Sequence, residues 1–175
     1  MVSLSERPLS IFELTQFANA ILQEFEHDRP EYLPLAQFHC STGCRVTELF
    51  QSFRWLLSSK TTLTITPQKN NATRIVSLAD VGIENEEHFY RLLDDMDRLP
   101  KNQYERQFSK AVKIVGLWRC YEGGFLHPST HFFRHLKIKL LKTQGYDKNF
   151  IASWIGEKNP DNLDYYLNSQ YFGEV

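Results

Sequence analysis

Apolar residues recur at helical spacing through most of the chain, and this period predicts a mainly helical protein. The helices expected from this spacing cover residues 11–26, 33–39, 46–50, 88–99, 103–117, 130–144, 149–154 and a short segment that opens at 159. Ser10 and Glu13 form a capping box before the first helix. Gly43 is expected to end the second helix, and Ser41 or Thr42 to cap the third.

Between the third and fourth helices the pattern changes to a period of two. Residues 61–66 alternate polar and apolar side chains, residues 74–78 do much the same, and a polar segment separates them. This arrangement predicts a β-hairpin with Lys69 near its turn. The expected fold class is therefore mainly α with a small antiparallel β-sheet, an α+β architecture.

Composition and charge narrow the classes of function only slightly. A chain of 175 residues fits one domain with a real core, and 42% hydrophobic residues is ordinary for a soluble globular protein. The formal net charge of −1 gives no global attraction to nucleic acid, so any anion site must arise from local clustering. The charges do segregate, because residues 84–98 carry six acids whereas residues 101–113 and 134–148 are rich in bases.

The three cysteines, Cys40, Cys44 and Cys120, are an odd number in a chain without a secretory leader. They predict reduced thiols in a protein that is not secreted and lies in the interior of a cell. No apolar run approaches the length needed to span a bilayer, so no membrane association is expected.

The candidate chemistry lies in the last third of the chain. His131 and Arg134 are three residues apart, which places them on one face of a helix where both can point into one pocket. A guanidinium fork and an imidazole together suit an anionic oxygen cluster such as a phosphate. Tyr165 and Tyr166 follow close to the C-terminus and offer a hydroxyl nucleophile.

A cysteine-based alternative fits the residues less well. Cysteine-dependent phosphatases place five residues between the nucleophile and an Arg, whereas only four separate Cys40 from Arg45. Cys40 and Cys44 also lack a second pair of ligands, so zinc is not expected, and no metal site is predicted.

Two segments in the first half of the chain resemble motifs of the tyrosine recombinase (phage integrase) family. Residues 41–50 resemble its first motif, in which a Thr-Gly turn precedes an Arg, here Arg45, with a Glu three residues later, here Glu48. Lys69 looks like the hairpin lysine of the family, which is followed five residues on by an Arg, here Arg74.

Two further segments continue the resemblance. Residues 131–135 are similar to the His-x-x-Arg-His box of the family, and residues 155–157 stand where it carries Leu-Gly-His. Glu157 follows Arg134 by 23 residues, and Tyr166 follows Glu157 by nine, intervals that suit the family. Each motif alone is weak, but four in order over residues 10–170 make a strong signal.

The resemblance implies an enzyme that cleaves and rejoins DNA through a 3′-phosphotyrosyl intermediate. Tyr166 would attack the phosphodiester and release a 5′ hydroxyl, so that the bond energy is kept in a covalent link. Arg45 and Arg134 would clamp the non-bridging oxygens, and His131 would add a third donor. Lys69 would protonate the departing 5′ oxygen. No metal or nucleotide cofactor is implied.

Supporting roles and one departure from the family pattern follow from the same resemblance. Glu48 would orient Arg45, and His135 would act from behind the residues that touch the phosphate. Glu157 stands where the family has His or sometimes Trp, and a carboxylate beside a phosphate is repulsive unless it is protonated or paired with an Arg. It is otherwise expected to pair with His135 or to turn outward. Tyr165 is the alternative nucleophile, although the nine-residue interval favours Tyr166.

The implied protein is a site-specific recombinase or integrase that acts on double-stranded DNA and self-associates there as a tetrameric synapse. It would work in the cytoplasm, at the nucleoid, or inside a host cell. Residues 1–175 are expected to form a single catalytic domain without the N-terminal DNA-clamping domain of the family. The alternative function is a non-catalytic DNA-binding protein that retains the recombinase fold.

Overall fold

The computed structural model describes residues 7–66, 73–117, 130–168 and 172–173. The α-helices are α1 (Ile11–Asp28), α2 (Leu33–Thr42), α3 (Val46–Leu49), α4 (Glu86–Arg98), α5 (Lys101–Ile114), α6 (His131–Thr143), α7 (Lys148–Ile155) and α8 (Leu163–Asn168). The strands are β1 (Arg7–Pro8), β2 (Trp55–Leu57), β3 (Thr62–Ile65), β4 (Arg74–Ser77) and β5 (Phe172–Gly173). Short 3-10 helices lie at η1 (Pro30–Tyr32), η2 (Ser52–Arg54), η3 (Ala79–Val81) and η5 (Pro160–Asn162). The predicted fold class, mainly α with a small antiparallel sheet, is confirmed.

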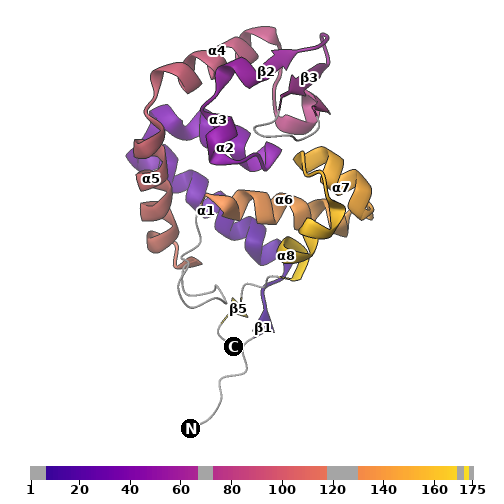
Figure 1. Cartoon of the computed structure of the whole chain (residues 1–175). Coiled ribbons are helices and arrows are strands. Elements are labelled where there is room, and N and C mark those ends of the chain that lie inside the picture. Colours follow the sequence, from indigo (N-terminus) through magenta and orange to yellow (C-terminus); the bar gives the residue numbers. More distant parts are fainter. Residues whose placement is uncertain (1–6, 67–72, 118–129, 169–171, 174–175) are drawn as a thin grey trace.

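Helix α6 lies in the middle of the molecule and contacts α1, α2, α7 and α8 (Figure 1). Its apolar side chains enter two hydrophobic clusters. Phe132 and Phe133 belong to the large cluster shared with α1, α2 and α5, whereas Ile138 belongs to a smaller one shared with α7 and α8. Helix α6 therefore joins both clusters, with the side chains of its N-terminal end in the large one and those further along in the smaller one.

The helix pattern of the sequence matches the structure closely, with one wrong cap. The capping box at the start of α1 is present, and the predicted bounds of α4 to α7 agree within three residues. Ser41 and Thr42 do not cap α3, because α2 continues through Thr42, whose hydroxyl donates to Phe38 O at 2.8 Å. The N-cap of α3 is Arg45 instead.

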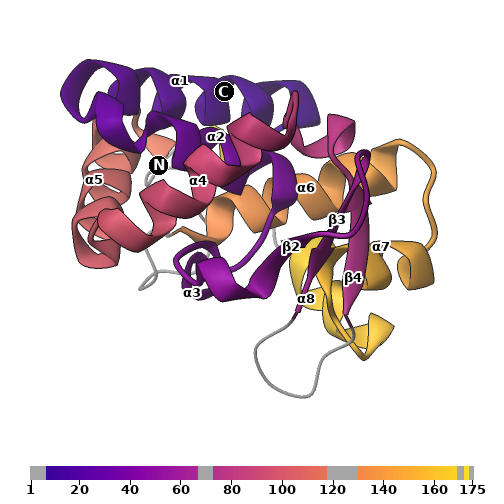
Figure 2. The ribbon, with the colours of Figure 1, turned by 90° about the horizontal axis from the view of Figure 1, so that it is seen from above.

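The central sheet has the antiparallel order β2–β3–β4, and Leu63 is paired with Val76 in the predicted hairpin. Lys69, expected near the turn, lies outside the described residues. Strand β2 was not predicted, since its residues, Trp55 to Leu57, are apolar without alternation. Figure 2 shows this sheet beside α7, at the end of the molecule away from α5.

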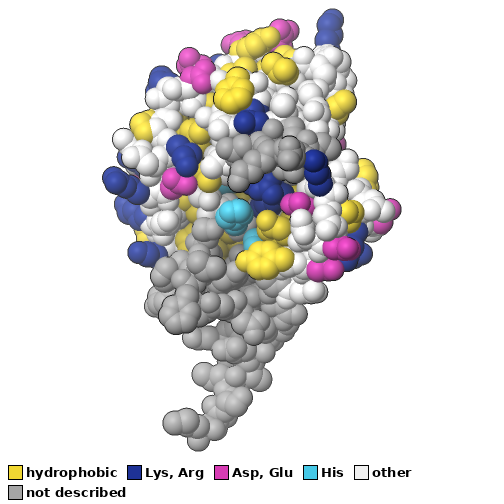
Figure 3. Space-filling view, in the orientation of Figure 1, with side chains coloured by type: hydrophobic (Ala, Val, Ile, Leu, Met, Phe, Trp, Pro, Cys, Tyr) yellow, Lys and Arg dark blue, Asp and Glu magenta, His cyan; other side chains and the backbone are white. Residues whose placement is uncertain are grey.

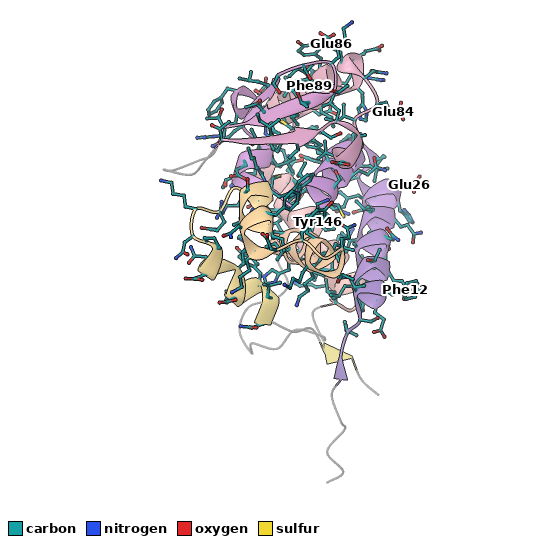
Figure 4. The ribbon with its side chains drawn as sticks, turned by 90° about the vertical axis from the view of Figure 1, so that its right-hand side faces the viewer. Phe12, Glu26, Glu84, Glu86, Phe89 and Tyr146 are labelled. Carbon is teal, nitrogen blue, oxygen red and sulfur yellow. The ribbon has the colours of Figure 1, made fainter. Side chains whose placement is uncertain are left out.

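Residues from the two ends of the chain meet in a second, very short sheet. Arg7 pairs with Gly173 and Pro8 with Phe172, both antiparallel, so the segment before α1 lies against the segment after α8. Figure 4, a view of the molecule from the right-hand side of Figure 1, shows Phe12 and Glu26 of α1 pointing away from the body and Phe89 of α4 pointing inward. In the part of the chain that is described, no helix has both the length and the apolar character required to cross a membrane.

Candidate active site

Arg45 is carried by a tight turn that α2 presses against α6. Gly43 ends α2 with φ +60°, and a Cβ at this position would lie 2.7 Å from Cβ of Lys137. A glycine is therefore required both by the left-handed backbone and by the close approach of α6. This contact fixes where Arg45, two residues later, enters the site.

A buried histidine fastens the same turn to the core. His39 is 0% exposed; its Nε2 lies 3.1 Å from Cys44 O, and its Nδ1 lies 2.7 Å from the hydroxyl of Tyr104. A carbonyl only accepts, so Nε2 carries the proton, and Nδ1 accepts from Tyr104. Burial lowers the pKa of His39 to about 3, so the ring is neutral at physiological pH.

Glu48 joins Arg45 to a second arginine, Arg74, in a buried ion pair. Glu48 is 2% exposed and Arg74 is 4% exposed, and Arg74 Nη2 lies 3.4 Å from Glu48 Oε2. The same carboxylate accepts from the backbone N–H of Arg45 at 3.0 Å and lies 3.7 Å from Arg45 Nη1. Arg74 Nη1 also donates to Trp154 O at 2.7 Å. These contacts are the ones expected of a residue that orients Arg45.

Arg134 is a wholly buried cation at the start of α6. Its Nη1 donates to Gly43 O and to Ile155 O, both at 3.2 Å. Its Nε and Nη2 are buried without a hydrogen-bond acceptor among the described residues. Burial and, second, the charge of Arg45 lower the pKa of Arg134, although a guanidinium stays protonated. Buried N–H groups without acceptors are costly, so this arrangement is suited to an anionic ligand.

Glu157 lies between the two arginines. Its Oε2 is 3.3 Å from Arg45 Nη2 and 3.9 Å from Arg134 Nη2, while its Oε1 accepts from Asn162 Nδ2 at 3.0 Å. Of the orientations considered from the sequence, the outward turn and the pairing with His135 are therefore not the ones found. Two neighbouring guanidinium groups attract the carboxylate more strongly than a buried neutral imidazole does.

The two histidines of the box differ in exposure. His131 is exposed at the first position of α6, and partial desolvation followed by the charges of Arg134 and Arg45 lowers its pKa. His135, one turn further on, is buried, and this burial lowers its pKa to about 3. In Figure 3, histidine, basic and acidic side chains gather near the middle of one face, next to residues that the structure does not describe.

Tyr166, rather than Tyr165, lies against the buried arginine. The ring centre of Tyr166 is 5.6 Å from Cζ of Arg134 and 4.7 Å from the ring centre of His135. Tyr165 is 59% exposed, and its ring centre is 5.7 Å from that of His135. Helix α8 thus brings Tyr166 to Arg134 and turns the preceding residue, Tyr165, toward solvent.

The structure brings most of the residues singled out in the sequence into one site. Arg45, Glu48, Arg134 and Glu157 are joined by the ion pairs above, His131 and His135 flank Arg134 on α6, and Tyr166 lies over its guanidinium. Lys69 lies outside the described residues. No group of three or more His, Cys, Asp or Glu side chains able to hold a metal ion occurs in the described parts of the chain.

Three contributors to the site were not predicted as site residues from the sequence, although Arg74 was matched to the arginine that follows the hairpin lysine of the family. Arg74 carried a usable signal, because it lies in phase with the buried Val76 on an alternating strand, where a charged side chain requires a buried partner. His39 and Asn162 carried none, since a histidine on an apolar helix face and an Asn after Pro160 are both common. Their roles depend on partners far away in the sequence or on the local path of η5.

The fold is that of tyrosine recombinase catalytic domains, as solved structures similar to it show. The chain matches XerA recombinase with a TM-score of 0.64 and 18% identity over 93% of this chain and 60% of that one. It matches the catalytic core of lambda integrase with a TM-score of 0.60 and 22% identity over 86% of this chain and 95% of that one.

A lambda integrase tetramer bound to a Holliday junction is also similar, with a TM-score of 0.65 and 19% identity over 91% of this chain and 47% of that one. The chain thus spans about half to three fifths of the length of the longer recombinases that it matches. No family model and no curated protein matches the sequence. The resemblance inferred from the four motifs is confirmed at the level of the fold.

Proposed function

We propose that this chain is the catalytic part of a site-specific DNA recombinase or integrase that breaks and rejoins strands through a 3′-phosphotyrosyl intermediate. The observation that carries the proposal is the buried Arg134 guanidinium. Two of its nitrogens lack an acceptor among the described residues, and it lies between the Tyr166 ring and the side chain of Glu157, which pairs with Arg45. A nucleophile beside two converging guanidinium groups is the arrangement that attack on a phosphodiester requires.

In the proposed reaction the Tyr166 hydroxyl gives its proton to water as its oxygen forms a bond to phosphorus. The bond from phosphorus to the 5′ oxygen breaks, and that oxygen takes up a proton, for which Lys69 is the predicted donor. Arg45 and Arg134 donate to the non-bridging oxygens, where negative charge develops, and His131 adds a donor from the open side of α6. A new 5′ hydroxyl reverses the steps and rejoins the strands.

Double-stranded DNA and further copies of the chain are the proposed partners. Support comes from the similar structures, which include a lambda integrase dimer bound to a core site and the tetramer on a Holliday junction. The chemistry proposed needs neither a metal nor a nucleotide, because the arginines supply the positive charge and the tyrosine keeps the bond energy. We assign such a protein to the interior of the cell that holds its DNA.

The second candidate function is a DNA-binding protein that keeps the fold but does not cleave. The position of Glu157 favours it, because a carboxylate stands between the arginines that would hold the phosphate. The two candidates differ in one product, a covalent link between protein and DNA.

A covalent trapping assay separates the candidates. The protein is incubated with duplexes that carry a randomised segment and a nick in one strand, so that cleavage beside the nick releases a short fragment and prevents rejoining. Adducts are separated on denaturing gels and sequenced. The recombinase proposal predicts an adduct that is lost in Tyr166→Phe and kept in Tyr165→Phe, its matched control from the neighbouring position.

Other outcomes decide against the proposal. A shift of the DNA in native gels with no adduct in any variant assigns the chain to the non-catalytic class. An adduct lost in Tyr165→Phe but kept in Tyr166→Phe reverses the assignment of the nucleophile. An activity that depends on Cys40 and acts on a small phosphoester supports the phosphatase alternative, against which the raised pKa of that partly buried thiol already argues.

A further inference from the structure

The carboxylate of Glu157 occupies the space in which two arginines converge. Charge-assisted hydrogen bonds between a guanidinium and a carboxylate normally have N···O distances of about 2.7–2.9 Å. Here a single oxygen, Oε2, lies 3.3 Å from Arg45 Nη2 and 3.9 Å from Arg134 Nη2. Glu157 therefore satisfies neither arginine at the usual distance.

The poor fit has a geometric cause. The other oxygen, Oε1, accepts from Asn162 and so points away from the arginines. Only Oε2 remains for the two guanidinium groups. Arg134 therefore keeps Nε and Nη2 without an acceptor among the described residues. A tetrahedral oxyanion presents several oxygens at wide angles and can accept from both guanidinium groups at once.

We propose that Glu157 is an internal occupant of the anion site between Arg45 and Arg134, and that an incoming tetrahedral oxyanion must displace its carboxylate. This inference deepens the proposed function and rests on it in one respect, that the natural anion is the phosphodiester of a DNA strand. The site itself follows from the two arginines and their unfilled hydrogen-bonding capacity.

The charges around the site show why displacement matters. Arg45, Arg74 and Arg134 carry three positive charges, and Glu48 and Glu157 carry two negative charges within the same network. Glu48 is committed to Arg74 in the core, so Glu157 is the carboxylate that competes with a ligand. While Glu157 remains in place, a phosphate meets a like charge a few ångströms away.

The surroundings allow the carboxylate to leave. Asn162 belongs to the exposed segment η5, and Glu157 follows Gly156, whose φ of +74° ends α7. Rotation of the Glu157 side chain toward solvent breaks the contacts to Asn162 and the arginines and leaves the backbone of α7 unchanged. The exchange is thus local: one acidic side chain leaves the site as one anion enters.

Binding of tungstate, measured by isothermal titration calorimetry at fixed salt, tests the proposal without any strand cleavage. Glu157→Gln removes the competing charge and is expected to bind tungstate about tenfold more tightly than the wild type. Asn162→Ala keeps every charge but releases the anchored oxygen, and it is expected to bind about two- to threefold more tightly. Glu26→Gln makes the same change on the outer side of α1, where Glu26 points away from the body of the molecule (Figure 4). It is the control for net charge and is expected to leave the affinity for tungstate unchanged.

Adding Arg45→Gln to Glu157→Gln is expected to remove the gain in affinity for tungstate, because one of the two guanidinium groups that bind the anion is lost. The proposal is overturned if Glu157→Gln binds tungstate as the wild type does or more weakly, or if Glu26→Gln produces the same gain. Glu157→His, which introduces the residue type that the family resemblance implies at this position, is expected to give equal or higher adduct yield on nicked DNA. Tighter tungstate binding without an adduct in any variant would retain the internal occupant and reject the strand-transfer function.

Discussion

The buried histidine behind the arginine turn makes a quantitative prediction about acid stability. His39 is 0% exposed and has a pKa of about 3 in the folded protein, against about 6.5 in an unfolded chain. Between these values the unfolded state binds a proton and the folded state does not, so the free energy of unfolding falls as pH falls. The loss begins near pH 6.5 and continues toward pH 3. At pH 5 it amounts to about 2 kcal/mol for this one histidine.

His135 is also buried and has the same pKa of about 3, so the wild type should lose roughly twice this amount of unfolding free energy. The contribution of His39 is isolated by His39→Gln, because a glutamine does not titrate yet can accept from Tyr104 and donate to Cys44 O. The difference in unfolding free energy between wild type and His39→Gln should therefore change by about 2 kcal/mol between pH 7.5 and pH 5.

Urea denaturation followed by tryptophan fluorescence at a series of pH values measures this difference directly. His27→Gln removes an exposed histidine at the end of α1 and is the matched control, expected to run parallel to the wild type. If the wild-type and His39→Gln stabilities stay parallel from pH 7.5 to 5, the lowered pKa and the neutral state of the buried His39 are refuted.

Two further predictions concern the frame of the site, and both are measured by urea denaturation. Gly43→Ala should lower the free energy of unfolding by about 3 kcal/mol, because the positive φ is strained and the new Cβ would lie 2.7 Å from Lys137. The control, Gly82→Ala, has a positive φ but open space around the new Cβ, and it should lower that free energy by only about 1 kcal/mol. Equal losses in the two variants would contradict the predicted clash with Lys137. Glu48→Gln should cost about 3 kcal/mol, because it leaves the buried Arg74 without a counter-charge; a loss no larger than that of the exposed Glu26→Gln would show that the ion pair contributes little.

The elements of the fold were largely predictable because each is set by its own local pattern. The capping box at Ser10 and Glu13, the periodic apolar face of α1 and the alternation in β3 and β4 all act over a few residues. Strand β2 was not predicted because it lacks such a local pattern. Its residues, Trp55 to Leu57, do not alternate between polar and apolar, and they form a strand by pairing with β3. The predicted cap of α3 was wrong because the Thr42 hydroxyl could either cap α3 or donate within α2. Because α2 continues through Thr42, the hydroxyl donates to Phe38 O.

The site divides in a similar way. Arg45, His131, Arg134 and Tyr166 stood out through spacing and resemblance, and the structure places them together. The orientation of Glu157 could not be read from the chain, because it depends on a guanidinium 112 positions away and on an amide five positions on. A sequence names the groups that can interact; only the tertiary arrangement selects the pairs that form.

The buried arginines hold the site together through main-chain oxygens. Arg74 donates to Trp154 O, and Arg134 donates to Gly43 O and Ile155 O. These bonds join the two arginines to α7 and to the end of α2, and none of them depends on the side chain of the accepting residue. Substitutions at 154 and 155 that preserve the backbone path leave these bonds intact, whereas a residue inserted or deleted within α7 would shift the acceptor oxygens of Trp154 and Ile155. Such a frame tolerates wide sequence drift, in keeping with the 16–22% identity between this chain and solved structures that share its fold.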